Sequence, residues 1–159
     1  RDSAFQMYYD PIIWSDSSQV TGDTIFLTLR ENKLDSLKIF SNGFIISEND
    51  LGMYNQIKGR NMYGKFSNND LRRVYVSGNG QTVYFPKDDQ DEYIGMNRAL
   101  CSNILIKLKD NEVKSITFLN KPEAKLHPLS EATGEITRLE GLTPRFEERP
   151  MSKASLLEE

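Results

Sequence analysis

One pattern occurs three times in this chain, and it limits the possible folds more than any other feature of the sequence. Residues 56–85 align without a gap with residues 19–48 at an offset of 37 positions, and with residues 98–127 at an offset of 42 positions. In the first alignment Gly59 falls on Gly22 and Gly80 falls on Gly43. A fixed period of this size is typical of stacked repeats, in which each unit covers the apolar face of the next.

Each repeat has the residue pattern of a β-hairpin. In the middle repeat, residues 60–66 alternate between apolar and polar side chains, residues 71–76 do so again, and a short polar turn joins them. A second corner follows at residues 77–80, where we expect Asn79 and Gly80 to need left-handed backbone. Each repeat would then hold three or four short strands. The sequence therefore predicts an all-β fold of stacked antiparallel β-hairpin repeats.

The inward positions of these predicted strands form one apolar stripe that runs through all three repeats. Its members are Ile25, Leu27, Leu29, Leu37, Ile39, Met62, Phe66, Val74, Val76, Ile104, Ile106, Leu108, Ile116 and Phe118. Because side chains alternate along a strand, Tyr63 and Tyr75 should lie on the opposite face. In a closed sandwich the stripe would be core, whereas in an open roll it would line a ligand groove.

The repeats also divide the chain. Residues 5–15 align with residues 37–47 at an offset of 32 positions, so the chain begins within a repeat and we expect a fragment of a longer protein. We predict one β-repeat domain over residues 1–127 and a C-terminal cap or partly disordered tail over residues 128–159. An open stack leaves edge strands at both ends, which predicts head-to-tail self-association.

No group of residues in the sequence has the pattern of an active site or a metal site. His127 is the only histidine, and no nucleophile motif accompanies it. Cys101 falls where Gly59 lies in the preceding repeat, so we expect a small buried side chain rather than a reactive thiol. The acidic run at residues 88–92 lacks the pattern of an EF-hand loop, which favours a solvated connector. We therefore expect a non-enzymatic protein that uses no metal and no cofactor.

Charge and aromatic content restrict the partners. The net charge is −3, and Lys and Arg do not cluster with aromatic residues along the sequence, which disfavours nucleic acid as a partner. Eight aromatic residues could form a platform for stacking sugars: Tyr8, Tyr9, Trp14, Tyr54, Tyr63, Tyr75, Tyr84 and Tyr93. Strand propensity and cross-strand pairing also account for Tyr63 and Tyr75. A carbohydrate-binding module or a structural β-repeat scaffold is therefore the alternative function.

Three segments resemble a known family. They are WSDSSQVTGDTI at residues 14–25, YNQIKGRNMYGKF at residues 54–66 and VYVSGNGQTVYF at residues 74–85. With the repeated return strands and corners, they are similar to the OstA-like, or LptA, family of periplasmic lipopolysaccharide-transport proteins, which includes the amino-terminal domain of LptD. The resemblance covers residues 5–126, and its specificity comes from the repetition of short motifs.

This resemblance implies both a fold and a function. The fold would be an open, twisted β-jellyroll, a V-shaped roll whose inner faces bind the acyl chains of lipid A. The apolar stripe would then be the ligand-binding surface. The function implied is binding of lipopolysaccharide and its transport across the periplasm to the outer membrane, together with other components of a lipopolysaccharide-transport bridge. The location implied is the periplasm, with association with the outer membrane as a further option.

Overall fold

The computed structural model describes residues 2–15, 17–110 and 112–149. The protein is all-β, as the repeats predict, and has one antiparallel sheet of ten strands that does not close into a barrel. The strands are β1 (Ser3–Met7), β2 (Ile12–Ser15), β3 (Ser18–Thr21), β4 (Thr24–Arg30), β5 (Lys33–Glu48), β6 (Tyr54–Ser67), β7 (Asp70–Tyr84), β8 (Met96–Lys109), β9 (Glu112–Phe118) and β10 (Glu123–His127). Three single 3-10 turns follow: η1 (Leu129–Glu131), η2 (Gly134–Thr137) and η3 (Phe146–Glu148).

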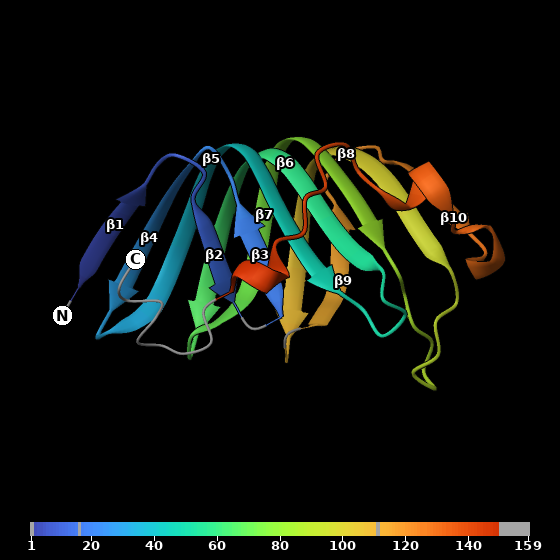
Figure 1. Cartoon of the computed structure of the whole chain (residues 1–159), viewed down its shortest axis with the longest axis horizontal. Coiled ribbons are helices and arrows are strands. Elements are labelled where there is room, and N and C mark those ends of the chain that lie inside the picture. The colour runs from blue at the N-terminus through green and yellow to red at the C-terminus, as the bar shows by residue number, and fades with distance from the viewer. Residues whose placement is uncertain (1, 16, 111, 150–159) are drawn as a thin grey trace.

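Four long strands connect two halves of the sheet. The first part of β5 pairs with β4 and its second part with β3, while β8 pairs first with β10 and then with β9. The sheet therefore folds over, and Figure 1 shows the strands descending in two directions from a ridge at the top of the view. The hairpin half consists of β1, β4, β9 and residues 33–40, 61–67, 70–77 and 103–109. The strap half consists of β2, β3, β10 and residues 43–48, 54–59, 80–84 and 96–101.

The long strands correct one expectation from the sequence. Each repeat was expected to hold three or four short strands, but β5 to β8 are continuous and have 16, 14, 15 and 14 residues. The expected corners are bends within these strands, at which the pairing register shifts. The physical reason is that a bulge changes the direction of a strand without ending its ladder of hydrogen bonds.

Left-handed backbone makes these bends. The pair Ser41–Asn42 in β5 has φ of 65° and 57°, and the pair Gly78–Asn79 in β7 has φ of 88° and 52°. The pair Tyr9–Asp10, with φ of 62° at both residues, occupies the equivalent place in the first partial repeat. The repeat offsets of 37 and 32 positions place these three pairs on one another, so the structure confirms the alignment of the repeats.

The role expected for Gly80 is wrong in its mechanism. Its backbone lies outside the left-handed region, and the left-handed residue is Asn79, one position earlier. A Cβ atom at Gly80 would lie 2.4 Å from the carbonyl oxygen of Cys101 and 2.7 Å from Cδ1 of Ile104. Glycine is required here because the neighbouring strand approaches closely, and not because of backbone freedom.

The hairpin turns lie where the sequence places them, at the free edge of the hairpin half. Glu31–Asn32 and Asn68–Asn69 each have two successive residues with positive φ, and Asp110 begins the third turn in the same way. Two successive left-handed residues are the signature of the type I′ turn, whose twist matches that of the flanking strands. Short polar side chains tolerate this backbone, which explains the repeated turn composition.

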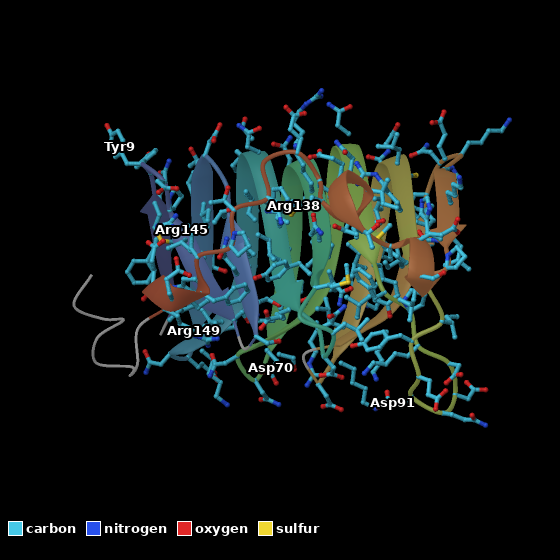
Figure 2. The ribbon with its side chains drawn as sticks, turned by 45° about the vertical axis from the view of Figure 1, so that its right-hand side comes forward. Tyr9, Asp70, Asp91, Arg138, Arg145 and Arg149 are labelled. Atoms are coloured by element: carbon cyan, nitrogen blue, oxygen red, sulfur yellow. The ribbon has the colours of Figure 1, made fainter. Side chains whose placement is uncertain are left out.

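Two apolar clusters stabilise the folded sheet. The main core lies between the halves and consists of Val20, Ile25, Leu37, Ile39, Ile45, Ile57, Met62, Leu71, Val74, Val76, Cys101, Ile104 and Ile106. The second cluster lies on the outer face of the strap half and consists of Phe44, Ile46, Val83, Phe85, Met96, Ala132 and Leu139. The last two of these belong to residues 128–149, which we call the strap. The strap crosses the sheet from η1 to η3 and covers this outer face (Figure 2).

Two glutamines in equivalent repeat positions hold the backbone of the strap. Gln56 donates from Nε2 to the carbonyl of Thr137 at 2.7 Å, and its Oε1 accepts from the amide of Leu139 at 2.7 Å. Gln19 makes the same pair of bonds six residues further along the strap. Both glutamines are buried, so these bonds satisfy amide groups that would otherwise be unpaired. The tail expected from the sequence therefore includes a segment that packs on a face of the sheet.

We expect Gln56→Ala to release the middle of the strap. The change removes both bonds and leaves the amide of Leu139 without its partner, which costs roughly 2–4 kcal/mol of unfolding free energy. Hydrogen exchange should speed up at residues 136–142. Gln6→Ala, on the exposed strand β1, is the matched control and should change stability by less than about 0.5 kcal/mol. Equal exchange in both variants would contradict a role for Gln56 in holding the strap.

Candidate functional site

The structure brings the predicted stripe together between the two halves. Eight of its residues have no more than 1% of their surface exposed: Ile25, Leu37, Ile39, Met62, Val74, Val76, Ile104 and Ile106. Five more are partly buried and pack against these: Leu27, Phe66, Leu108, Ile116 and Phe118. Leu29 lies at the margin, in a surface groove beside Thr28 and Arg30. The stripe also continues into the strap half through residues that the sequence analysis missed: Val20, Ile45 and Ile57.

Side chains fill most of the space between the halves. A cavity that remains between described residues of the two halves has a volume of about 20 Å³ and is lined mainly by apolar residues, among them Ile45, Ile57 and Leu108. A space of this size holds about one water molecule. An acyl chain can therefore enter only when the two halves move apart.

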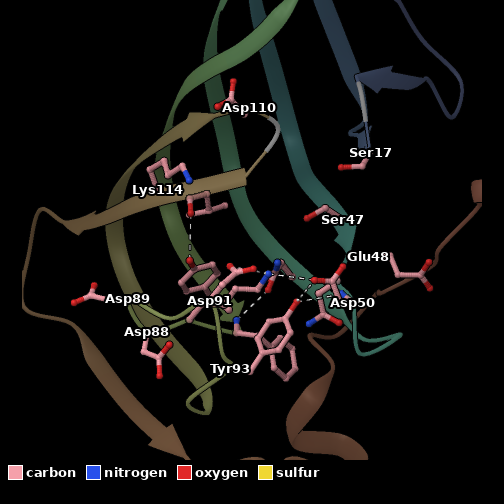
Figure 3. Close-up of a pocket in the computed structure, with 16 residues that line it drawn as sticks. Ser17, Ser47, Glu48, Asp50, Asp88, Asp89, Asp91, Tyr93, Asp110 and Lys114 are labelled. Atoms are coloured by element: carbon pink, nitrogen blue, oxygen red, sulfur yellow. Dashed lines mark hydrogen bonds and ion pairs between the residues drawn. The ribbon is translucent and has the colours of Figure 1, made fainter.

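A larger cleft adjoins this cavity, and we call it the mouth (Figure 3). It has a volume of about 680 Å³ and shares four lining residues with the small cavity: Ser47, Asn55, Tyr84 and Val113. Its charged lining residues are Glu48, Asp50, Lys87, Asp88, Asp89, Asp91, Asp110 and Lys114. The apolar interior thus meets solvent through a polar, predominantly acidic opening.

A hydrogen bond joins the two halves at the mouth. The hydroxyl of Tyr84 in β7 donates to the carbonyl of Val113 in β9 at 3.2 Å. Tyr84 belongs to the strap half and Val113 to the hairpin half. Separation of the halves at this edge must break the bond, so Tyr84 is placed to influence access to the interior.

Lys87 holds the loops on one side of the mouth. Its Nζ lies 3.2 Å from the carboxylate of Asp50, 3.4 Å from that of Asp91 and 4.8 Å from the ring centroid of Tyr93. The hydrogen bond with Asp50 is the main reason that the pKa of Lys87 is raised above its ordinary value. Tyr93 also accepts from the amide of Asp50 at 3.1 Å. These contacts join residues 49–53 to residues 86–95, and Lys87 stays charged at neutral pH.

The remaining candidates for chemistry have structural contacts. Cys101 is buried, as expected, and its Sγ lies 3.2 Å from the carbonyl oxygen of Asn103 and 3.4 Å from that of Asn120, either of which can accept its one S–H. His127 ends β10 opposite Met96. Within residues 88–92, Asp88 accepts hydrogen bonds from two amides of its own loop, which accounts for this acidic run as a connector. Among residues 2–15, 17–110 and 112–149, no group of three or more His, Cys, Asp or Glu side chains is placed to hold a metal ion.

The eight aromatic residues do not form one sugar-stacking platform. Tyr8 and Tyr9 are exposed at the first corner, and Tyr84 and Tyr93 line the mouth. Trp14 and Tyr54 pack against Phe146 of the strap, with ring centroids 5.7 and 6.2 Å away. Tyr63 and Tyr75 stack on each other on the outer face of the hairpin half, 6.2 Å apart. Strand bending and the strap divide the aromatic residues among these four places.

No protein-family model and no curated protein matches this chain. In the part of the chain that the structure describes, no helix has the length and apolar character needed to cross a bilayer. The function is therefore inferred from the geometry of the sheet, its interior and its mouth.

Proposed function

We propose that this chain is a non-enzymatic module that binds lipopolysaccharide through the acyl chains of lipid A and passes it across the periplasm to the outer membrane. The observation that carries the proposal is one open sheet folded over a continuous apolar stripe, with a polar mouth beside it. An acyl chain gains free energy from such a surface because its burial removes apolar area from water. The resemblance of residues 14–25, 54–66 and 74–85 to OstA-like proteins supports the same ligand.

Binding in this proposal requires the halves to open. The interior has room for about one water molecule, so the apolar side chains must separate before an acyl chain can lie among them. The bends at Ser41–Asn42 and Gly78–Asn79 lie on the ridge between the halves and are the natural hinge points. The bond between Tyr84 and Val113 holds the opposite edge. Lipid binding and the closed state therefore compete.

The same proposal assigns the arrangement and the partners of the module. The folded sheet is a V-shaped roll, an open twisted β-jellyroll whose repeats stack along its length. Its edge strands carry unpaired backbone groups, which pair either with a second copy of the chain or with other components of a lipopolysaccharide-transport bridge. Because the two ends differ, copies associate head to tail. The module works in the periplasm, free or associated with the outer membrane.

The experiment measures uptake of lipid A by the purified chain, with native mass spectrometry for stoichiometry and a fluorescent acyl probe for rate. We expect one bound lipid per chain and faster uptake by Tyr84→Phe, by about two- to tenfold, because this change removes only the hydroxyl that joins the halves. Tyr75→Phe, on the outer face, is the matched control and should behave like the unmodified chain.

The outcomes separate the proposal from its alternative. If neither the unmodified chain nor Tyr84→Phe takes up lipid A, the interior is a closed core and the chain is a carbohydrate-binding or structural module. If Tyr84→Phe and Tyr75→Phe change the rate equally, the bond to Val113 does not control access. Sedimentation velocity over a range of concentrations tests the head-to-tail contact, and a strict monomer at high concentration would exclude it.

A further inference from the structure

The outer face of the hairpin half carries a row of aromatic side chains that runs across the strands. Phe26 in β4, Phe40 in β5, Tyr63 in β6 and Tyr75 in β7 make it up, and we call it the aromatic row. Phe40 packs edge-on against Phe26 at 5.6 Å and against Tyr63 at 6.4 Å, and Tyr63 stacks on Tyr75 at 6.2 Å. Phe40 and Tyr63 each have 37% of their surface exposed. Solvent therefore reaches an almost continuous strip of aromatic surface.

A row of cations runs directly beside it. Lys65 in β6 lies opposite Arg73 in β7, and Arg73 lies opposite Lys107 in β8. We call these three residues the cation row. All three are exposed. Lys65 and Arg73 each lie two residues along their strand from a member of the aromatic row, Tyr63 and Tyr75, and Lys107 continues the cation row into β8. Lys38, between Phe26 and Tyr63 in the sheet, adds a fourth positive charge to the same face.

This arrangement is electrostatically unfavourable for the isolated protein. Like charges directly opposite each other on neighbouring strands destabilise a sheet. Among the described residues, one member of the cation row forms an ion pair: Lys65 lies 3.6 Å from the carboxylate of Asp35. Two further carboxylates, Asp23 and Asp70, lie at the margins of the face, beside the ridge and at the hairpin turn. Four cations are thus gathered on one face of a chain whose net charge is −3.

We propose that this face binds an anionic polysaccharide that lies across the strands. The apolar faces of pyranose rings pack on the aromatic row, as apolar groups do on Tyr and Phe surfaces, and carboxylate or phosphate groups bind the cation row. From β4 to β8 the two rows together span about 19 Å, which suits an extended chain of several sugar units. The surface lies outside the interior between the halves, so this proposal does not depend on lipid binding.

The charge of the protein favours an acidic polysaccharide over a nucleic acid. A duplex carries one negative charge per ~1.7 Å, and domains that bind nucleic acids are usually strongly basic. Three or four cations on a chain of net charge −3 suit a polymer with more widely spaced charges. Basic and aromatic residues do not cluster along the sequence, but the sheet gathers them on one face because β4 to β8 lie side by side.

The experiment measures binding of polygalacturonate by isothermal titration calorimetry at several salt concentrations. We expect Arg73→Ser/Lys107→Ser to weaken binding by at least about tenfold and to reduce its dependence on salt. Tyr63→Thr/Tyr75→Thr should weaken binding by about tenfold while leaving the salt dependence unchanged. Neutral dextran should bind more weakly than polygalacturonate to the unmodified chain.

Matched controls keep the test specific. Lys121→Ser/Lys125→Ser removes two exposed cations elsewhere, and Tyr9→Asn removes the most exposed aromatic residue while tolerating its left-handed backbone; neither should change affinity. Removing Arg73 and Lys107 relieves repulsion, so the unfolding midpoint should not fall. Absence of polygalacturonate binding, equal losses in the control variants, or tighter binding of single-stranded DNA would each overturn the proposal. Unchanged uptake of lipid A by the Arg73/Lys107 and Tyr63/Tyr75 variants would show that this outer face and the interior between the halves act independently.

Discussion

Ile39→Asp is expected to unfold the protein. Ile39 has no exposed surface and lies between Ile25 and Met62, its neighbours across β4 and β6. An aspartate there would place a carboxylate in the main core with no cation to pair with it, which costs more than about 4 kcal/mol. Domains of this kind are stable by about 5–15 kcal/mol, so most or all of the stability would be lost. Circular dichroism during urea titration measures the effect.

Phe40→Asp is the matched control, because the next residue of the same strand faces the opposite side. Phe40 is partly exposed, so the variant should lose roughly 1 kcal/mol through the edge-on contacts with Phe26 and Tyr63. A larger loss in Phe40→Asp than in Ile39→Asp would mean that the side-chain alternation of β5 is the reverse of the one described, and equal losses would mean that the two faces are equally buried.

Gly80→Val is expected to cost about 3 kcal/mol or more. The added Cβ would meet the carbonyl oxygen of Cys101 at 2.4 Å, and a backbone oxygen in a paired strand cannot rotate away. Asparagine at this position should be nearly as harmful, because the obstacle is the space for any side chain. The unfolding midpoint in urea measures both variants.

Gly52→Ala separates this clash from backbone strain. Gly52 has φ of +73°, and a Cβ atom added there would have no other atom within 4 Å, so the change should cost only about 1 kcal/mol through its left-handed backbone. If Gly80→Val loses no more stability than Gly52→Ala, the close approach of Cys101 does not constrain the strand.

Local features of the fold could be predicted because their causes are local. The turns at residues 31–32 and 68–69 need consecutive left-handed residues, and the polar residues at these positions predict such turns. The offsets between repeats even place Tyr9–Asp10 on Ser41–Asn42, although the two pairs share no residue type. The apolar stripe of the hairpin half follows from period-two alternation, and its central members are buried as that pattern requires.

The strap and the mouth could not be predicted in the same way. Gln56 bonds to residues more than 80 positions away, and a buried glutamine has no sequence signature that distinguishes it from an exposed one. One signal was available: Phe44, Ile45 and Ile46 are consecutive apolar residues, which indicates a strand covered on both faces. The size of the mouth depends on how closely the two halves approach each other. Side-chain packing determines that distance, and the alternation of apolar and polar residues along the strands does not.

The contacts of Gln19 and Gln56 link the length of the strap to the number of strands that it crosses. Because Gln19 and Gln56 bind only backbone groups, they constrain the spacing along the strap and leave its side chains free to vary. Six residues of strap correspond to a step of two strands, about 9–10 Å, although six extended residues could reach about 20 Å. The strap is shortened by a turn in which the amide of Leu142 donates to the carbonyl of Leu139 at 3.1 Å. A chain with one further repeat would need a C-terminal segment longer by the same increment, so the two lengths can change only together.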